Sequence, residues 1–410
     1  MRILFLPAYY YPEHAASSYL GDNIREAICI NGDEVVLFAP VPCRGVSEEI
    51  RNDYSRPPHL KEVLFDGKLS VNRFPLIREG KNAISRFLRY VICWIKQYRR
   101  GRMAKGIDCI FLASTPPIQG LLGAFLKSRM KIPFVYNLQD IFPDSLAGTG
   151  LAKKGGLLWK IGRVIENYTY KKADKIIVIS EDFKKNIMAK GVPEEKIEVV
   201  YNWVDTEAVK PVIKEDNPLF EEFGLSRDKF TVVYAGNLGN AQYVSVILDA
   251  ASTIPDVQFA IFGTGGMEDE LRARIQKEGL TNAHLLPLQP MERVSQVYSL
   301  GDACVVTCKA GLGGSAMPSK TWSIMSCGRP VIASFDEGEL KVILEKNECG
   351  VFAHAGIVQE FVDAIKTLQD NPEHCLEMGE NARQFILDNL TKEVGTRKYV
   401  EVIKSFEKKQ

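Results

Sequence analysis

The feature that most constrains the fold of this chain is a regular alternation of short apolar runs with segments of helical spacing, which occurs twice along the sequence. In the first half, helical patterns separate apolar, β-branched runs at 3–6, 34–38, 109–113, 134–137, 175–179 and 197–201. A helical pattern over 17–31 follows the first of these runs directly. The order strand, loop, helix, strand predicts a doubly wound α/β fold with a parallel sheet, whose ligands bind at the carboxyl ends of the strands.

The same alternation begins again near residue 205. Helical patterns now separate strand-like runs at 230–235, 258–262, 284–287, 303–307 and 330–334. A chain of 410 residues exceeds what one hydrophobic core usually covers, so two α/β domains are expected, with a cleft between them. We place the domains at 1–204 and 205–388, followed by a helical segment, 389–410, that is long enough to cross back to the first domain.

Composition and residue spacing exclude several classes of protein. The nine cysteines occur singly, and the closest pair, Cys304 and Cys308, lies in an apolar run, which favours reduced core thiols in a cytoplasmic protein. The five histidines are dispersed and no Asp-x-Asp triplet occurs, so the sequence requires no metal. We also expect neither a signal peptide nor a transmembrane helix, because no leader pattern and no apolar run of about 18 residues is present.

Charge is distributed unevenly between the two halves. Up to residue 200 the chain has 31 Lys and Arg against 21 Asp and Glu, a balance of +10, and the remainder has 21 against 30, a balance of −9. Such asymmetry predicts that the first half alone meets an anionic surface. Nucleic acid is not expected as the partner, because no aromatic stacking platform or reader motif accompanies the basic residues.

The segment 81–105 contains eight basic residues and no acidic one, while apolar residues recur at helical spacing from Ile84 to Tyr98. This pattern predicts a basic amphipathic helix. Its apolar stripe could pack on the domain core, leaving the charges as a solvated face. We favour peripheral contact with an anionic membrane surface at the inner face of the cell membrane, because Trp94 and the cluster of Arg99, Arg100 and Arg102 add an interfacial aromatic and a polybasic stretch.

The segment 311–334 reads as a glycine-rich loop, a short helix and an apolar strand. Pro318 suits the first turn of a helix and Gly328 suits its end, which predicts a helix over 318–327. Ser319 and Lys320 then lie in the first turn, beside the loop with Gly313, Gly314 and Ser315. A diphosphate suits such a pocket. Alternatively, the glycines are ordinary loop residues and Lys320 is a solvated surface lysine.

Several motifs in this order resemble one known family. They are YYYPEHAASS after the first strand, YNLQDIFPDS, ADKIIVISE, YNWVD at the junction, AGNLGNAQ, FGTGG and PSKTWSIMSCGRPVIAS. Over nearly its whole length the chain is similar to family 4 glycosyltransferases of the GT-B fold, in particular to the bacterial WbuB/WcaI-like branch that builds O-antigen, capsule or colanic-type exopolysaccharide. The resemblance implies two Rossmann-like domains with parallel sheets facing across a cleft.

The resemblance also implies an activity, the retaining transfer of an amino- or deoxy-hexose from a nucleoside diphosphate donor, a UDP- or GDP-sugar, without a required cofactor. The second domain would bind the donor. Two serines, Ser315 and Ser323, stand where the family usually has a pair of glutamates, and Asn237 stands where a basic residue is common, which leaves Lys320 to neutralise the leaving diphosphate. The implied donor-binding residues are Gly236, Asn237, Gly239, Gln242, Gly263, Gly265, Gly313, Gly314, Ser315, Ser319, Lys320 and Ser323.

On the acceptor side, the resemblance implies that the first domain binds a saccharide acceptor, which in many relatives is linked to a lipid. Asp140 matches the aspartate of a family segment in which Asp144 replaces the usual glutamate, and it could accept the proton of the acceptor hydroxyl. It could equally be a turn or cap residue before Phe142 and Pro143. Glu13 and His14 could orient the acceptor, although His14 could also be a loop residue without a task.

Two other functions remain compatible with the sequence. A sugar-nucleotide epimerase has a similar two-domain shape, but it would need neither an acceptor nor the basic helix. An inactive, membrane-bound scaffold of a polysaccharide assembly complex is also compatible, because the usual glutamate pair is absent. Arg25 and Glu26 are expected to be solvated helix positions without a role.

Overall fold

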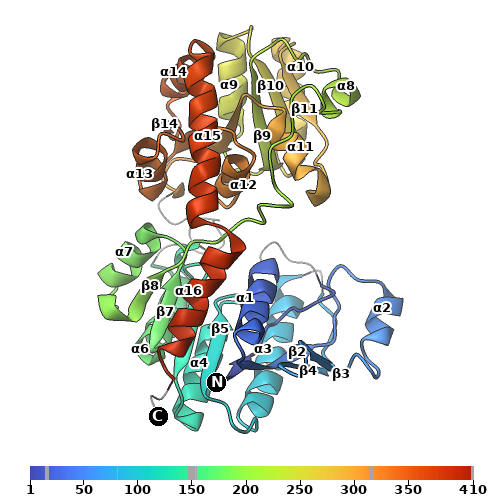
Figure 1. Cartoon of the computed structure of the whole chain (residues 1–410), viewed down its shortest axis with the longest axis vertical. Helices are drawn as coiled ribbons and strands as arrows, with labels where there is room; N and C mark the ends of the chain where they lie inside the picture. Colours follow the sequence, from blue (N-terminus) through green and yellow to red (C-terminus); the bar gives the residue numbers. More distant parts are fainter. Residues whose placement is uncertain (14–17, 81, 146–152, 154, 314–316, 408–410) are drawn as a thin grey trace. The chain divides into compact units, whose positions relative to one another are not determined.

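The computed structural model describes the chain except for residues 14–17, 81, 146–152, 154, 314–316 and 408–410 (Figure 1). The polypeptide divides into two compact units, Met1–Tyr201 together with Gly395–Gln410, and Asn202–Val394. Each unit is an α/β domain built on a sheet of mostly or wholly parallel strands, as the alternating sequence pattern predicts.

The sheet of the first unit has eight strands in the order β3-β4-β2-β1-β5-β6-β7-β8. All neighbours are parallel except β3, which pairs antiparallel with β4. The strands are β1 (Arg2–Phe5), β2 (Glu34–Pro40), β3 (Lys61–Leu64), β4 (Leu69–Phe74), β5 (Cys109–Ala113), β6 (Phe134–Leu138), β7 (Lys175–Val178) and β8 (Ile197–Val199). The order reverses between β1 and β5, which is where open α/β sheets bind ligands.

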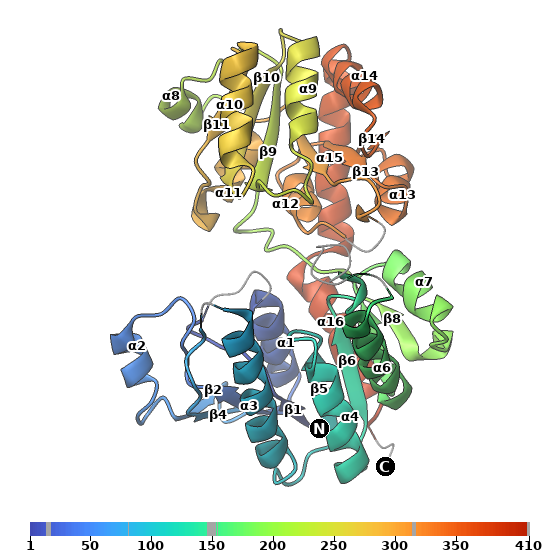
Figure 2. The same cartoon turned by 180° about the vertical axis from the view of Figure 1, so that it is seen from behind.

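Helices cover both faces of this sheet. One face is covered by α3 (Ala83–Gly101), α4 (Gln119–Met130), α6 (Leu157–Lys172) and α7 (Glu181–Ala189), as Figure 2 shows. The other carries α1 (Ser18–Ile30) and α16 (Lys392–Lys404), and the short α2 (Glu48–Asp53) precedes β3. The strands between these layers are almost wholly apolar, and Ile3, Leu4 and Ile110 have no exposed surface.

The second unit has a wholly parallel six-stranded sheet in the order β11-β10-β9-β12-β13-β14. Its strands are β9 (Thr231–Asn237), β10 (Gln258–Thr264), β11 (Ala283–Leu286), β12 (Ala303–Thr307), β13 (Val331–Phe335) and β14 (Gly350–His354). Its helices are α8 (Leu219–Phe223), α9 (Ser245–Thr253), α10 (Glu268–Glu278), α11 (Val294–Ser299), α12 (Lys320–Ser326), α13 (Glu339–Lys346), α14 (Val358–Gln369) and α15 (Pro372–Asn389). Among the described residues, a short 3-10 turn occurs at Glu194–Lys196 in the first unit and another at Met291–Arg293 in the second.

Three strands, β3, β4 and β14, were absent from the sequence analysis. Strand β3 is largely exposed, so apolar alternation does not mark it. The turn that joins it to β4 contains Asp66-Gly67, a common hairpin sequence, with positive φ at Phe65, Asp66 and Gly67, and this signal was not used in the prediction. Strand β14 begins at Gly350, where an added Cβ would lie 2.2 Å from the Val331 carbonyl oxygen. Glycine is required there for close strand approach, although in a sequence it is typical of a strand break.

Within the described residues, no helix combines the length and apolar character that crossing a bilayer requires. The same part of the chain holds no cluster of three or more His, Cys, Asp or Glu side chains placed to bind a metal ion. All nine cysteines are free thiols, and all but Cys43 are buried.

Candidate functional site

Lys320 is the first residue of α12, in the second unit. The helix is shorter than the expected 318–327, because Pro318 and Ser319 precede it and Cys327 follows it. Gly328 has a φ of +65°, which agrees with its expected place at the helix end. Ser319 is exposed and makes no side-chain cap hydrogen bond, and Ser323 is half-buried within the helix.

The Lys320 ammonium group packs closely against the end of β9. Its Nζ is 4.2 Å from the centroid of the Tyr234 ring, close enough for a cation–π contact. A Cβ added at Gly236 would lie only 2.6 Å from this Nζ, so the absence of a side chain at Gly236 makes room for Lys320.

Burial lowers the pKa of Lys320 to about 8, and no carboxylate of the described residues counteracts this effect. A desolvated cation without an anionic neighbour is unfavourable for folding alone. Lys320 is therefore a candidate for binding an anionic ligand. The alternative, that Lys320 is a solvated surface lysine, does not agree with this desolvation.

The loop after β9 lies beside Lys320. Tyr234 donates a hydrogen bond from its hydroxyl to the Asn237 carbonyl oxygen at 2.8 Å, and Asn237 Nδ2 donates to Gln242 Oε1 at 3.2 Å. A Cβ at Gly239 would lie within 2.8 Å of both side chains of that pair. The structure thus brings together four of the expected donor residues, Gly236, Asn237, Gly239 and Gln242.

Gly263 and Gly265 have a packing role of their own. A Cβ at Gly263 would lie 2.3 Å from the Gly236 carbonyl oxygen, and one at Gly265 would lie 2.6 Å from the Leu238 carbonyl oxygen. Both glycines therefore allow the end of β10 to approach the loop after β9. Their direct contact with a donor stays a prediction.

Asp336, which the sequence analysis did not identify, holds the glycine-rich loop. Its carboxylate accepts hydrogen bonds from the Gly311 amide at 3.0 Å and the Gly313 amide at 2.7 Å. The Gly313 N–H is therefore already engaged within the protein. Of the other expected loop residues, Gly314 and Ser315 lie outside the described residues.

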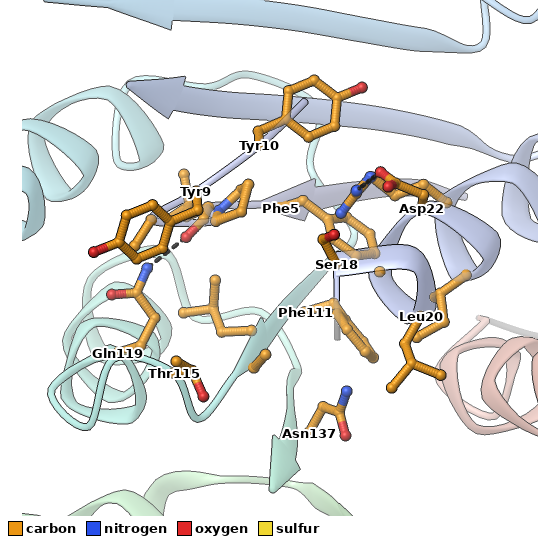
Figure 3. Close-up of a pocket in the computed structure, with 18 of the residues that line it drawn as sticks. Phe5, Tyr9, Tyr10, Ser18, Leu20, Asp22, Phe111, Thr115, Gln119 and Asn137 are labelled. Atoms are coloured by element: carbon orange, nitrogen blue, oxygen red, sulfur yellow. Dashed lines mark hydrogen bonds and ion pairs between the residues drawn. The ribbon is translucent and has the colours of Figure 1, made fainter. Parts of the chain in front are cut away.

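In the first unit, a cavity of about 140 Å³ lies at the carboxyl ends of β1, β5 and β6 (Figure 3). Aromatic rings and polar groups line it together, a combination suited to a saccharide, whose apolar ring faces and hydroxyl groups need both. The aromatic residues are Phe5, Tyr9, Tyr10, Tyr11 and Phe111, and the polar ones are Ser18, Asp22, Arg25, Thr115, Gln119, Asn137 and Gln139.

Arg25 is part of this cavity wall and is buried, so the expectation that it is a solvated residue was wrong. Its side chain is buried, pairs with Asp22, and lies over the rings of Tyr10 and Phe5, at 5.0 and 5.7 Å from their centroids. The guanidinium stem and plane pack well on aromatic faces, which is why a charged residue can occupy the inner face of α1.

A polar network fixes the floor of the cavity and involves α16. Tyr399 donates a hydrogen bond from its hydroxyl to Asn137 Oδ1 at 3.0 Å, and Gln139 Nε2 donates to the same oxygen at 2.9 Å. Ser114, directly after β5, accepts hydrogen bonds from the amides of Gln139 at 3.0 Å and Asp140 at 3.2 Å. Neither Ser114 nor Tyr399 was predicted from the sequence, because each acts through residues far away in the chain.

Asp140 follows the cavity-lining Gln139 but does not itself line the cavity. Although part of its surface is exposed, desolvation of the carboxyl group raises the pKa of Asp140, against the opposing effect of hydrogen bonds from Ser145 and the Ile141 amide. A raised pKa suits a proton acceptor better than a freely solvated carboxylate does. Asp144, by contrast, forms an ion pair with Lys190 at 2.6 Å.

Glu13 is buried, and its carboxylate binds the backbone of the surrounding loops. It accepts hydrogen bonds from the amides of Cys43 and Arg44, both at 2.8 Å, and from Tyr10 at 3.4 Å. Glu13 thus ties the loop after β1 to the loop after β2. Its action on an acceptor stays a prediction, and His14 lies outside the described residues.

Unlike an ordinary surface helix, the basic helix α3 buries polar side chains and exposes several apolar ones. Arg89 and Gln97 have no exposed surface, while Ile84, Phe87, Leu88 and Ile95 are exposed. The alternative in which the apolar stripe packs on the domain core therefore holds only in part, because these four residues are exposed whereas Ile92 packs against the core cluster of Phe74, Leu76 and Cys93.

Several basic side chains of α3 also differ from the expected solvated cluster. Arg89 lies 4.7 Å from the centroid of the Tyr9 ring, and Arg100 lies 4.6 Å from that of Phe74. Lys96 Nζ donates to the Pro75 carbonyl oxygen at 2.6 Å. Among the described basic residues of the segment, the exposed ones are Arg86, Arg99, Arg102 and Lys105.

Comparison with known proteins agrees with this architecture. The family profile described as glycosyltransferase family 4 matches residues 22–208, and the profile described as glycosyl transferases group 1 matches residues 216–385. The putative colanic acid biosynthesis glycosyl transferase WcaI of Escherichia coli is 26% identical over 98% of this chain and all of its own length. The probable glycosyltransferase WbjE of Pseudomonas aeruginosa is 23% identical over 68% of this chain and 69% of its own.

Among solved structures, HepE of Anabaena in complex with UDP has a TM-score of 0.72 at 18% identity and covers 99% of this chain and all of its own. WaaG, a glycosyltransferase involved in lipopolysaccharide biosynthesis, has a TM-score of 0.66 at 12% identity, over 98% of this chain and 99% of its own. Two family profiles that succeed each other along almost the whole chain, a full-length relative and a shared two-unit fold agree on one assignment. The chain is a glycosyltransferase of the GT-B fold and belongs to the family 4 type.

Proposed function

We propose that this glycosyltransferase moves an amino- or deoxy-hexose, with retention of configuration, from a UDP- or GDP-sugar to a lipid-linked saccharide during surface polysaccharide synthesis. It would act at the cytoplasmic face of the membrane. The observation that carries the proposal is Lys320, a half-buried lysine whose ammonium group is desolvated and has no carboxylate partner among the described residues. The similarity to WcaI supports the polysaccharide context, and the UDP complex of HepE supports a nucleotide donor.

On the donor side, Lys320 would bind the diphosphate. Negative charge grows on the departing diphosphate as the bond to the sugar breaks, and a fixed cation in a desolvated pocket stabilises that charge more than water does. Asn237 and Gln242 are hydrogen-bonded to each other after Gly236, which lies beside Lys320, and they would offer amide groups to the nucleotide or the sugar. Ser323 is half-buried on the same helix, where the family usually has a glutamate.

On the acceptor side, the cavity at β1, β5 and β6 would hold the saccharide, and Asp140 would take the proton of its reacting hydroxyl. The new bond joins that hydroxyl oxygen to the sugar carbon as the diphosphate leaves, and the released proton goes to the Asp140 carboxylate. Ser114 positions Asp140 through its backbone amide.

Helix α3 would hold the enzyme at an anionic membrane, where a lipid-linked acceptor is found. Four exposed apolar residues on a helix without acidic residues support this role. Because Lys96 and Arg100 bind inward, the attraction would come from Arg86, Arg99, Arg102 and Lys105. Each basic residue near an anionic leaflet contributes about 1 kcal/mol.

Thermal-shift measurement with UDP-, GDP- and dTDP-sugars tests the donor assignment, because a bound ligand raises the stability of the folded protein by mass action. We expect one nucleotide class to stabilise the protein. Slow hydrolysis of that donor should then release a sugar with the donor's anomeric configuration. An epimerised nucleotide sugar would indicate the epimerase alternative, and binding without hydrolysis or transfer would indicate a scaffold.

A further inference from the structure

Helix α6, on the same sheet face as α3, also turns its apolar side away from the protein. Its inner face consists of Gly162, Glu166, Thr169 and Tyr170, all buried. Its outer face carries five exposed apolar or aromatic residues at helical spacing, namely Leu157, Leu158, Ile161, Val164 and Tyr168. Exposed apolar surface of this extent is unfavourable in water and typically marks an interaction site.

The inward contacts show that this orientation is built in. Glu166 accepts hydrogen bonds from Tyr170 at 2.8 Å and Lys190 at 2.9 Å, and it also pairs with Arg163. A Cβ at Gly120 of α4 would lie 2.5 Å from Thr169 Cγ2, so α4 and α6 are closely packed through small side chains. Helix α6 could not turn its apolar face inward without breaking the buried Glu166 cluster.

An aromatic chain connects the apolar sides of three neighbouring helices. Trp94 of α3 lies edge-on to Phe125 of α4, with ring centroids 5.7 Å apart, and Phe125 lies 6.1 Å from Tyr168 of α6. Figure 2 shows the three helices side by side on this face of the first unit. We call this surface, formed by the exposed residues of α3, Phe125 and the exposed residues of α6, the three-helix face.

The excess of basic residues on the three helices indicates an anionic partner. Helices α3, α4 and α6 contain five, two and four basic residues, and their only acidic residue, Glu166, is buried and paired. Apolar side chains with aromatics and surrounding Lys and Arg suit the boundary between lipid headgroups and acyl chains of an anionic bilayer. Protein interfaces, in contrast, are depleted in lysine.

The three-helix face also borders the acceptor cavity. Tyr9, which lines the cavity, donates to the Tyr90 hydroxyl of α3 at 3.1 Å. At the other side, a Cβ at Gly162 of α6 would lie 2.8 Å from Pro143, in the loop that follows Asp140. The second turns of both helices, which contain Tyr90 and Gly162, therefore adjoin the loops that carry Tyr9 and Asp140.

We infer that α6 is a second membrane-binding helix, and that the three-helix face inserts into an anionic bilayer so that the acceptor cavity opens beside the lipid surface. This inference rests on the proposed membrane contact of α3 and assigns the second half of that contact. A lipid-linked saccharide could then reach the cavity without leaving the bilayer.

Vesicle sedimentation of the full chain tests the inference, with vesicles of phosphatidylethanolamine and phosphatidylglycerol compared with pure phosphatidylcholine. The α6 variant is Leu158→Ser with Val164→Ser, at sites that are 65% and 69% exposed. The matched control, away from the three-helix face, is Ile30→Ser with Val63→Ser, at sites that are 75% and 67% exposed. A third variant, Phe87→Ser with Leu88→Ser, tests α3.

We expect the wild type and the control to bind anionic vesicles equally, within about twofold. The α6 variant and the α3 variant should each bind on the order of tenfold more weakly, because each loses two inserting side chains. Circular dichroism and nucleotide binding should be unchanged, since the substituted residues are exposed. If Leu158→Ser with Val164→Ser unfolds the protein, Ile161→Ser alone provides the same comparison.

Three results would overturn the inference. If the α6 variant binds vesicles as strongly as the wild type while the α3 variant loses vesicle binding, then α3 binds the membrane and α6 does not. If the wild-type protein does not bind anionic vesicles, neither α3 nor α6 is a membrane-binding helix. Donor binding and donor hydrolysis would still test the transferase proposal separately. A lipid-free dimer by light scattering that only the α6 variant dissociates would assign the face to a second copy of the chain.

Discussion

Lys320 shows how a single residue can indicate a ligand. Its ammonium group is desolvated, faces the Tyr234 ring and has a pKa lowered to about 8. The sequence could predict that Lys320 lies beside a glycine-rich loop. It could not predict Tyr234 or Gly236 as neighbours of Lys320, because both come from the end of β9, more than eighty residues away along the chain.

The lowered pKa of Lys320 predicts a pH dependence of donor binding. Below pH 8 the free protein holds the ammonium form, which attracts a diphosphate, and above pH 8 the neutral amine predominates. The affinity for nucleoside diphosphate, measured by calorimetry, should therefore fall as pH rises above about 8, by up to tenfold per pH unit. Lys320→Ala should bind more weakly and show no such fall. An unchanged wild-type affinity between pH 7 and 9.5 would be inconsistent with this role.

Gly236→Ala should displace Lys320. Gly236 has a φ of +148°, and an added Cβ would lie 2.6 Å from Lys320 Nζ. We expect a loss of stability of about 1–3 kcal/mol from backbone strain, together with weaker nucleotide binding. Urea unfolding and calorimetry check both effects. Gly266→Ala is the matched control, because it lies in open space on the neighbouring loop, and equal behaviour of the two variants would argue against the pocket.

At the scale of elements, periodicity located helices but could not orient them. The apolar stripe of 81–105 predicted a helix, found as α3 over Ala83–Gly101, and left open whether the stripe faces the core or a membrane. The answer depends on Arg89 and Gln97, whose buried positions follow from contacts with Tyr9 and the Pro7 carbonyl oxygen. These partners are distant in sequence, and the same reasoning explains why α6 was not singled out.

The return of α16 to the first unit depends on Tyr399. Tyr399→Phe removes the hydrogen bond to Asn137 Oδ1, and the loss of one buried hydrogen bond costs about 0.5–1.5 kcal/mol. Urea unfolding should show this loss. Tyr168→Phe, at an exposed tyrosine of α6, should have a stability within about 0.5 kcal/mol of the wild type. Equal stability of both variants would indicate that the Tyr399 network does not hold α16.

At the scale of the whole molecule, we propose that the two substrates bind to different units of the chain. The donor would bind the second unit through Lys320, and the acceptor would bind the first, with Asp140 as proton acceptor. The order of motifs predicted this division, because each motif follows a strand of one α/β half. Sequence could not reveal that Asp336 engages the Gly313 amide or that Ser114 fixes Asp140, since both are contacts between neighbouring strands.

The most direct measurement compares Lys320→Ala and Asp140→Asn in parallel, by calorimetric nucleotide binding and by sugar transfer to a membrane extract. Lys320→Ala should lose about tenfold to a hundredfold in nucleoside diphosphate affinity, because a charge-assisted contact contributes roughly 1.5–3 kcal/mol. Lys309→Ala, at an exposed lysine before the same loop, is the control and should bind like the wild type. Asp140→Asn should keep its nucleotide affinity within about twofold while transfer falls on the order of 10²-fold or more. If Lys320→Ala binds nucleoside diphosphate as tightly as the wild type, Lys320 does not bind the diphosphate. If Asp140→Asn loses donor affinity and not turnover, Asp140 is not the proton acceptor.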